Sequence, residues 1–273
     1  MSCRTGTLRC SALMSDYPRK KFSRGDSLKK VIHCKNVNNR KIIALLAVQV
    51  FLGVAPVLLL AAFVGFSMYN DKLLAIVIIV LIFLCNVAYM ITARRYNILN
   101  SGRRGEKQLF KTVKKLETDG YVFLNLPIRY KGGRSEADAI IIGEKGVVII
   151  EAKNHSGTIS GSWRSEKWTQ TKYYSNGKIT SAEMENPIKQ MRRQRDIVKS
   201  VFNAAGEDVW IDTVLYFSNE SARLKIHLRE NDYVCLGSDE LMNFLRNHKT
   251  NTRLSSEKMK RYEEILNEMR LKI

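Results

Sequence analysis

Two long uncharged stretches near the N-terminus constrain the fold of this chain most strongly. Ile42–Phe66 reads IIALLAVQVFLGVAPVLLLAAFVGF, and Leu73–Thr92 reads LLAIVIIVLIFLCNVAYMIT. Each meets the length of roughly 20 residues that a helix needs to cross the hydrocarbon core of a bilayer. Soluble helices rarely lack charges over such lengths, so a pair of buried core helices is the less favoured alternative. We therefore predict a transmembrane helical hairpin over residues 42–93, with spans at about 42–66 and 73–92.

The residues that flank these stretches predict the orientation of the hairpin. Arg40 and Lys41 precede the first stretch, Arg94 and Arg95 follow the second, and the short connection Ser67–Lys72 carries no net charge. Because Lys and Arg are enriched on the cytoplasmic side of spans, both termini are expected in the cytoplasm. The predicted location is the cell inner membrane, as a two-span protein with the lipid bilayer as a partner.

The net charge of the chain is +19, and its distribution separates a tail from a domain. The first 41 residues hold eleven Lys or Arg and two Asp, which predicts a basic, mostly disordered cytoplasmic tail over residues 1–41. The basic excess after residue 103 fits either an anionic partner such as nucleic acid or a solvated basic surface. The five cysteines are scattered without a CxxC spacing, so neither a disulfide framework nor a zinc site is predicted.

Residues 103–273 fit the length of one soluble domain. Strand-like apolar runs alternate with amphipathic helical ones, which predicts an α/β domain with a mixed sheet flanked by helices. The predicted helices are 106–119, a helix from Pro187 to about Phe202 with Asn186 as its N-cap, Ser238–Arg246 and Arg253–Lys272. The predicted strands are Tyr121–Leu126, Asp138–Ile142, Val147–Lys153, Val209–Phe217 and Tyr233–Leu236, with more short strands around Trp163 and Trp168.

Two of these strands are very apolar, are joined by a four-residue turn and carry charged residues at their outer ends. If Ile142 pairs with Val147, the antiparallel register places Asp138 opposite Glu151. Directly opposed residues have Cβ atoms roughly 5 Å apart, so one divalent ion can bridge the two carboxylates. Because side chains alternate along a strand, Lys153 shares a face with Glu151.

This predicted cluster has the ligand chemistry of a metal-dependent hydrolase. The carboxylates of Asp138 and Glu151 and the backbone carbonyl of Ala152 are hard oxygen ligands, which suit Mg²⁺ or Mn²⁺ rather than zinc. Such a metal polarises a phosphodiester and lowers the pKa of a bound water. Lys153 is placed to orient that water and to stabilise the charge that develops on the phosphate. A surface ion-pair patch made of the same residues is the alternative.

Further motifs make the pattern more specific than this cluster alone. They are Gly105-Glu106 at the start of the first soluble helix, Glu136-Ala137-Asp138, GVVIIEAKN over 146–154, Ser156-Gly157, Trp163, Trp168 and Asn186-Pro187-x-x-Gln190. With these motifs, residues 105–202 resemble the nuclease-related domain (NERD) family, a branch of the restriction-endonuclease-like PD-(D/E)xK fold.

The resemblance implies a role for individual residues. It makes Asp138 and Glu151 metal ligands and Lys153 the catalytic lysine. It makes Glu106 a candidate for orienting or completing the metal site, where a first-turn carboxylate stabilised by the helix dipole is the alternative. Gln190 matches the glutamine that several relatives in this fold point at the site, with an exposed helix residue as the alternative.

The predicted helix that carries Gln190 also has a basic side, which consists of Lys189, Arg192, Arg193, Arg195 and Lys199. In a nuclease these side chains contact phosphates without reading sequence; otherwise they are the solvated side of an amphipathic helix. Bases can stack on aromatic side chains, and the candidates are Trp163, Trp168, Tyr173 and Tyr174. For the two tryptophans, packing in the core is the expected role.

The sequence thus predicts a membrane-anchored, Mg²⁺- or Mn²⁺-dependent nuclease that hydrolyses phosphodiester bonds, with DNA favoured over RNA. The alternative is a non-catalytic, membrane-tethered module that binds nucleic acid or docks a protein, because a fold does not fix a function. A third hypothesis is a membrane-assembly protein in which the hairpin is the working part. Association into a homo-oligomer is left open.

Overall fold

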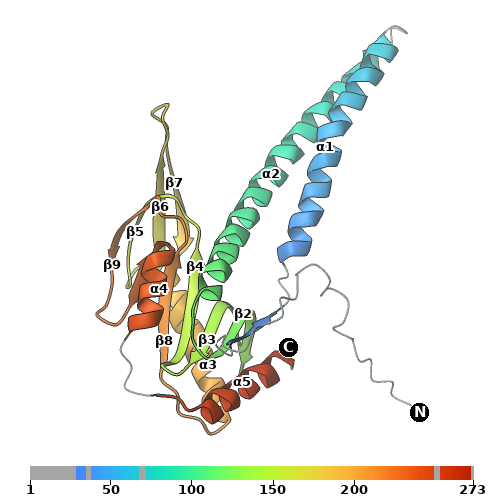
Figure 1. The fold of residues 1–273 in the computed structure, drawn as a ribbon. Coiled ribbons are helices and arrows are strands. Elements are labelled where there is room, and N and C mark those ends of the chain that lie inside the picture. Colours follow the sequence, from blue (N-terminus) through green and yellow to red (C-terminus); the bar gives the residue numbers. More distant parts are fainter. Residues whose placement is uncertain (1–28, 35–37, 68–71, 249–252, 272–273) are drawn as a thin grey trace, which may run out of the picture.

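The computed structural model describes residues 29–34, 38–67, 72–248 and 253–271. A long helical hairpin precedes a six-stranded sheet and a smaller four-stranded sheet, and helices flank the sheets (Figure 1). The prediction of a mixed α/β domain behind two long apolar helices is therefore confirmed. Most of the basic tail predicted over residues 1–41 lies outside the described residues.

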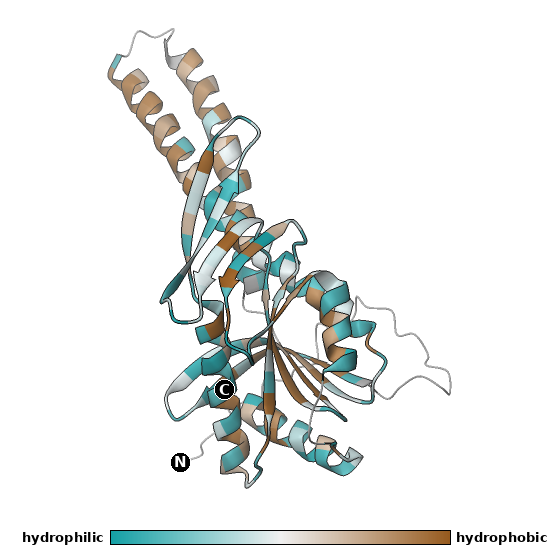
Figure 2. Cartoon of the chain, turned by 90° about the vertical axis from the view of Figure 1, so that its left-hand side faces the viewer, coloured by the Kyte–Doolittle hydropathy of each residue, from teal (hydrophilic) through white to brown (hydrophobic). Residues whose placement is uncertain are grey.

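The hairpin consists of α1 (Asn38–Ser67) and α2 (Lys72–Lys114), which pack along each other. Only 6% of the most apolar 18-residue window of each helix is buried, and Figure 2 shows the pair as two largely brown helices that project from the sheets. The core helices of a soluble domain are mostly buried, so this pair is not part of the domain core. Both helices are long and apolar enough to cross a membrane.

Helix α2 is longer than the sequence predicted. The sequence predicts a separate helix over 106–119, but α2 runs unbroken from the apolar stretch to Lys114. Residues 93–105 contain no proline, and a glycine inside a helix costs only about 1 kcal/mol. Contacts of Leu109 and Val113 with the sheet stabilise the last turns of the helix. On the α2 side, a continuous helix thus joins the hairpin to the domain.

The large sheet has the strand order β1-β2-β3-β4-β8-β10. Its strands are β1 (Lys29–His33), β2 (Gly120–Tyr130), β3 (Gly133–Gly143), β4 (Gly146–Lys153), β8 (Ile211–Phe217) and β10 (Tyr233–Leu236). Strands β2, β3 and β4 pair antiparallel, whereas β1, β8 and β10 join by parallel pairing. Helices α3 (Pro187–Ala204) and α5 (Ser256–Leu271) cover one face, and the end of α2 and α4 (Gly237–Asn247) cover the other.

Strand β1 corrects the prediction of a disordered tail for Lys29–His33. This segment is the edge strand next to β2, and Val31 and Ile32 pack on the two opposite faces of the sheet. Two apolar residues inside a basic segment are too short a run to indicate a strand. Because β1 precedes α1, both ends of the helical hairpin lie on the domain side (Figure 1).

The turn between β3 and β4 has the predicted register. Ile142 pairs with Val147, and Ile140 pairs with Ile149. Alternate residues of both strands enter the cores on the two faces of the sheet. This burial on both faces explains why the two runs are apolar without alternation.

The predicted start of α3 is also confirmed. Asn186 is fully buried, and its Oδ1 accepts a hydrogen bond from the backbone N–H of Ile188 at 2.9 Å. Its Nδ2 donates to the carbonyl oxygens of Ser162 and Ser165 at 3.0 and 2.6 Å. One side chain therefore caps the helix and ties it to the loop before β6.

The smaller sheet has the order β7-β6-β5-β9 and packs against the start of α3. Its strands are β5 (Gly157–Ser162), β6 (Lys167–Tyr173), β7 (Ile179–Glu185) and β9 (Ala222–His227). Trp168 is fully buried in its core, as expected for a packing role, and a Cβ on Gly161 would lie 2.3 Å from its ring. Short strands near the tryptophans were predicted, but β9 was not. The β6–β7 hairpin points in the same direction as α1 and α2 (Figures 1 and 2).

Replacing Asn186 tests its double role. We expect Asn186→Ala to lower the stability of the protein by more than the ~1 kcal/mol of a typical lost N-cap, because buried carbonyls also lose their donors. Asn186→Ser retains a capping oxygen and should lose less. The measurement is the Tm of the detergent-solubilised full chain; equal losses in the two variants would contradict a role in capping.

Candidate active site

The predicted cluster lies where β3 and β4 separate. The β2–β3 ladder does not pair Asn125 with Asp138, and Asn125 has a φ of 51°, a left-handed conformation that Asn adopts more readily than most residues. The β3–β4 ladder ends at Ala139–Ile150, one residue before Asp138. Asp138 thus sits at an irregularity of the sheet, where its side chain replaces a backbone partner of β4.

The structure brings Asp138 and Glu151 together. The backbone N–H of Ala152 donates to Asp138 Oδ2 at 2.7 Å. Burial raises the pKa of Asp138 well above its usual value, and the negative charge of Glu151 raises it further. Glu151 itself is 3% exposed. Two carboxylates in such a position favour a shared proton or a bound cation, because like charges disfavour full ionisation.

Lys153 completes the predicted group. Its Nζ lies 2.7 Å from Glu151 Oε1 and donates a second hydrogen bond to Gln190 Oε1 at 3.0 Å. Burial lowers the pKa of Lys153, but the charge of Glu151 and the hydrogen bond to it outweigh this and raise the pKa above its usual value. Lys153 is therefore a cation, and two of its three N–H groups have partners within the site.

Gln194 is a site residue that the sequence analysis missed. It is fully buried on α3, and its Nε2 donates to Glu151 Oε2 and to the carbonyl of Glu136, each at 2.7 Å. Its Oε1 has no hydrogen-bond partner in the described structure. The signal was present in the sequence, because Gln190 and Gln194 are four residues apart and so lie on one face of a helix.

Glu106 approaches the site from α2. Its negative charge is among the influences that raise the pKa of Asp138. The helix comes close to the end of β4 at Gly105, where a Cβ would lie 3.1 Å from Asn154 Cβ. Ser101 and Asn154 hold this contact, since Asn154 Nδ2 donates to the Ser101 carbonyl at 2.9 Å and Ser101 Oγ donates to the Asn154 carbonyl at 3.2 Å.

The donor set fits a Mg²⁺-type ion better than a zinc-type ion. Among the described residues, no three His, Cys, Asp or Glu side chains gather closely enough to hold a metal together. Mg²⁺ keeps several waters and needs only one or two carboxylates from the protein, and Asp138 and Glu151 as its ligands stay a prediction. Ala152 is half-buried between Glu151 and Lys153, and its carbonyl as a further ligand stays a prediction.

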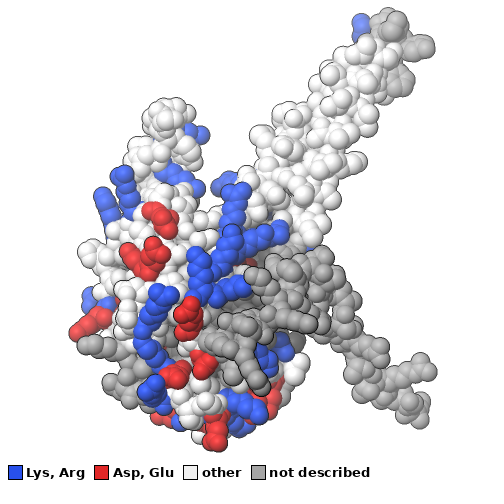
Figure 3. All heavy atoms as spheres, in the orientation of Figure 1, with Lys and Arg blue, Asp and Glu red and all other residues white. Residues whose placement is uncertain are grey.

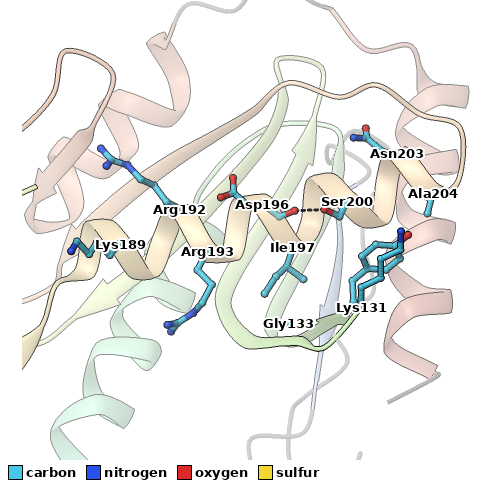
Figure 4. Close-up of a pocket in the computed structure, with 11 residues that line it drawn as sticks. Lys131, Gly133, Lys189, Arg192, Arg193, Asp196, Ile197, Ser200, Asn203 and Ala204 are labelled. Carbon is cyan, nitrogen blue, oxygen red and sulfur yellow. Dashed lines mark hydrogen bonds between the residues drawn. The ribbon is translucent and has the colours of Figure 1, made fainter. Parts of the chain in front are cut away.

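The basic residues predicted on α3 each have a carboxylate partner. Arg192 binds Asp232 through two contacts of 2.9 Å, and the other four pair with more exposed acids. Lys189, Arg192 and Arg193 line a surface pocket of about 880 Å³, with Lys131 on the facing β2–β3 turn (Figure 4). Arg195 and Lys199 do not line this pocket. Phosphate contacts by the five residues stay a prediction.

The aromatic candidates for base stacking differ in exposure. Trp168 is buried and has no free face. Trp163 is half-buried, and the guanidinium of Arg229 lies 3.6 Å from its ring centre. Tyr173 and Tyr174 are exposed at the tip of the β6–β7 hairpin. Stacking of bases on the two tyrosines stays a prediction.

Comparison with known proteins assigns the part of the chain that holds this site. The family model described as the nuclease-related domain, NERD, matches residues 101–218. This segment is a nuclease-related domain. It contains Glu106, Asp138, Glu151, Lys153 and Gln190, so all the predicted catalytic residues belong to it.

The chain also has a curated relative over part of its length. An uncharacterized protein of Bacillus anthracis is 37% identical over 71 residues, which are 25% of this chain and 34% of that protein. The chain thus spans about a third of the length of that relative. No solved structure matches this chain.

Gln194 offers a direct test of how the site is held. We expect Gln194→Ala to lower the stability of the protein by about 1–3 kcal/mol, because it leaves the buried Glu151 carboxylate and the Glu136 carbonyl without a donor. Gln190→Ala, one helical turn away, should cost much less, because Lys153 can turn to water. Both are measured as the Tm of the full chain; a greater loss in Gln190→Ala would contradict the assigned roles.

Proposed function

We propose that this protein is a membrane-anchored, metal-dependent nuclease that hydrolyses phosphodiester bonds, with DNA as the favoured substrate and a PD-(D/E)xK type of site. One observation carries the proposal: Asp138, Glu151 and Lys153 meet at the point where β3 and β4 separate, inside a nuclease-related domain. The three groups lie at the end of the large sheet, next to Gln190 and Gln194 of α3.

Each residue has a distinct role in this proposal. Asp138, Glu151 and the Ala152 carbonyl would hold Mg²⁺ or Mn²⁺. When bound, the metal polarises the phosphate and generates a nucleophilic water near neutral pH. Lys153 has one N–H left for a phosphate oxygen or the attacking water, and its positive charge stabilises the negative charge of the transition state.

The neighbouring glutamines and Glu106 act through these groups. Gln190 accepts a hydrogen bond from Lys153, and Gln194 donates one to Glu151; these bonds fix the two side chains. Glu106 adds negative charge at the same place, which favours a cation. Lys189, Arg193 and Lys131 line the pocket on the outer side of α3 and would contact the phosphates of the substrate.

The membrane part of the proposal rests on the apolar hairpin and its charged flanks. The hairpin is almost free of charge, and Lys and Arg gather where it meets the domain (Figure 3). Both ends of the hairpin are on the domain side, and the positive-inside rule then places the termini and the domain in the cytoplasm, at the inner membrane. Ser101, which contacts the end of β4, is six residues after Arg95, or about 9 Å along a helix. The site therefore lies close to the bilayer surface.

A second candidate function is a non-catalytic module that binds nucleic acid or docks a protein. It is favoured by the position of Glu106, which acts on Asp138 electrostatically but does not complete a three-ligand metal site among the described residues. In this case the basic residues of α3 matter for the activity in cells, and the carboxylates do not.

Cleavage by the full chain in nanodiscs is the main test. The substrates are supercoiled plasmid, linear duplex, single-stranded DNA and RNA, each with Mg²⁺, Mn²⁺ or chelator. We expect metal-dependent cutting that falls by about 100-fold or more in Lys153→Ala, since one lost transition-state donor has an effect of this size. Glu151→Gln should be equally impaired.

The matched control for cleavage is Lys189→Ala, on the same helix as Gln190 but outside the carboxylate cluster. It should cut with a modest, salt-dependent loss, because it removes one phosphate contact. No cutting of any substrate by the parent, with nucleic-acid binding intact in Lys153→Ala, would favour the non-catalytic module.

Metal binding can be measured independently of cleavage. A ligand that binds only the folded state at 100 times its Kd stabilises it by about 2.7 kcal/mol, so Mg²⁺ or Mn²⁺ should raise the Tm of the full chain. Asp138→Asn should abolish this increase, whereas Asp196→Asn, on the outer side of α3, should retain it. The same increase in both variants would contradict a metal site at Asp138.

A further inference from the structure

The tip of the β6–β7 hairpin exposes an unusual set of side chains. Tyr173, Tyr174 and Ile179 are 68%, 49% and 61% exposed. In the described chain after Ser101, six large apolar side chains are exposed, and these three adjoin, because Tyr173 and Tyr174 are consecutive and Tyr173 pairs with Ile179 across the hairpin. Soluble domains rarely expose adjoining apolar side chains to water, and a cluster of this kind marks an interaction surface.

The tip is an ordered turn. The N–H of Tyr174 donates to the Lys178 carbonyl at 2.9 Å, and the N–H of Gly177 donates to the Tyr174 carbonyl at 3.0 Å. Asn176 Oδ1 accepts from the N–H of Lys178 at 3.1 Å. The turn therefore presents its side chains in one fixed arrangement, which lowers the entropy lost on binding.

Two lysines flank the apolar side chains. Lys172 is half-exposed and Lys178 is exposed, and neither pairs with a carboxylate in the part of the chain that the structure describes. Tyrosine, isoleucine and unpaired lysine together suit the boundary of an anionic bilayer, where a ring lies at headgroup level and an ammonium meets lipid phosphate.

The direction of the hairpin agrees with this chemistry. Strand β4 ends against α2 at Ser101, and β5 begins only four residues after Lys153. From this end of the large sheet, the β6–β7 hairpin extends toward the same side of the molecule as the apolar helices, although it stands apart from them (Figures 1 and 2). A bilayer that holds α1 and α2 thus lies on the side to which the tip points.

We propose that the β6–β7 tip is a second membrane contact, in which Tyr173, Tyr174 and Ile179 enter the interface of the bilayer and Lys172 and Lys178 bind anionic headgroups. This inference rests on the proposed insertion of the α1–α2 hairpin, and it does not depend on cleavage. The α1–α2 hairpin holds the domain near the bilayer on one side only. A second contact, reached through β5 and β6, limits the tilt of the domain and gives the site a fixed height above the membrane.

Quenching by brominated lipid tests the proposal in the full chain. Tyr174→Trp is reconstituted at one copy per nanodisc of phosphatidylcholine and phosphatidylglycerol, with or without bromine on the acyl chains. The parent has three tryptophans and none in α1 or α2. We expect the added tryptophan to lose intensity, and more so with bromine near the headgroups than with bromine deep in the bilayer.

Two reporters make the result interpretable. Phe83→Trp, on α2, should be quenched by deep bromine; if it is not, the proposed membrane insertion fails. Trp210, 68% exposed at the opposite end of β8 from the site, serves as the built-in reporter that should not be quenched in the parent.

Several outcomes would overturn the tip contact alone. One is a quenched Phe83→Trp beside an unquenched Tyr174→Trp. Another is an emission change of Tyr174→Trp on addition of duplex DNA but not in brominated lipid, which would assign the tip to nucleic acid. A change seen only with two copies per disc would assign it to a second copy of the chain.

Discussion

Helix α2 is the constraint on which the arrangement of this protein depends. Its first half is apolar and exposed, and its second half packs Leu109 and Val113 into the core of the large sheet. Between them, Gly105 lets the helix approach the end of β4, and Ser101 and Asn154 exchange hydrogen bonds. Because no loop interrupts the helix, the position of the sheet relative to the hairpin is set by helix geometry.

The charged groups lie beside this contact, at the end of the sheet. Asp138 occupies the irregularity opposite Asn125, and its carboxylate binds the N–H that follows Glu151. Helix α3 then supplies Gln190 and Gln194 to hold Lys153 and Glu151. The buried charges are thus stabilised by hydrogen bonds from two elements, as low-dielectric sites require. Asp138 and Glu151, which together favour a bound cation, thus lie next to the Lys153 ammonium.

Local patterns predicted the elements that are regular and strongly apolar. The β3–β4 register followed from a short turn between two apolar runs, and the start of α3 followed from Asn186 and Pro187, whose cap chemistry is local. The predictions failed for features that are determined by tertiary contacts. The continuity of α2 depends on packing after residue 105, β1 depends on a partner some 90 residues away, and the role of Gln194 depends on the distance between α3 and β4.

The edge position of β1 has a consequence for biosynthesis. Its residues leave the ribosome before both apolar helices, whereas its partner β2 follows them, so their pairing closes a loop that contains the whole hairpin. Pairing over such a sequence separation is slow and comes late in folding. In a chain inserted as two spans, β1 and β2 are on the same side and can meet; a chain that inserts only one span separates them across the bilayer. Completion of the sheet edge therefore requires that both apolar helices cross the bilayer or that neither does, because an unpaired β2 would remain as an open edge.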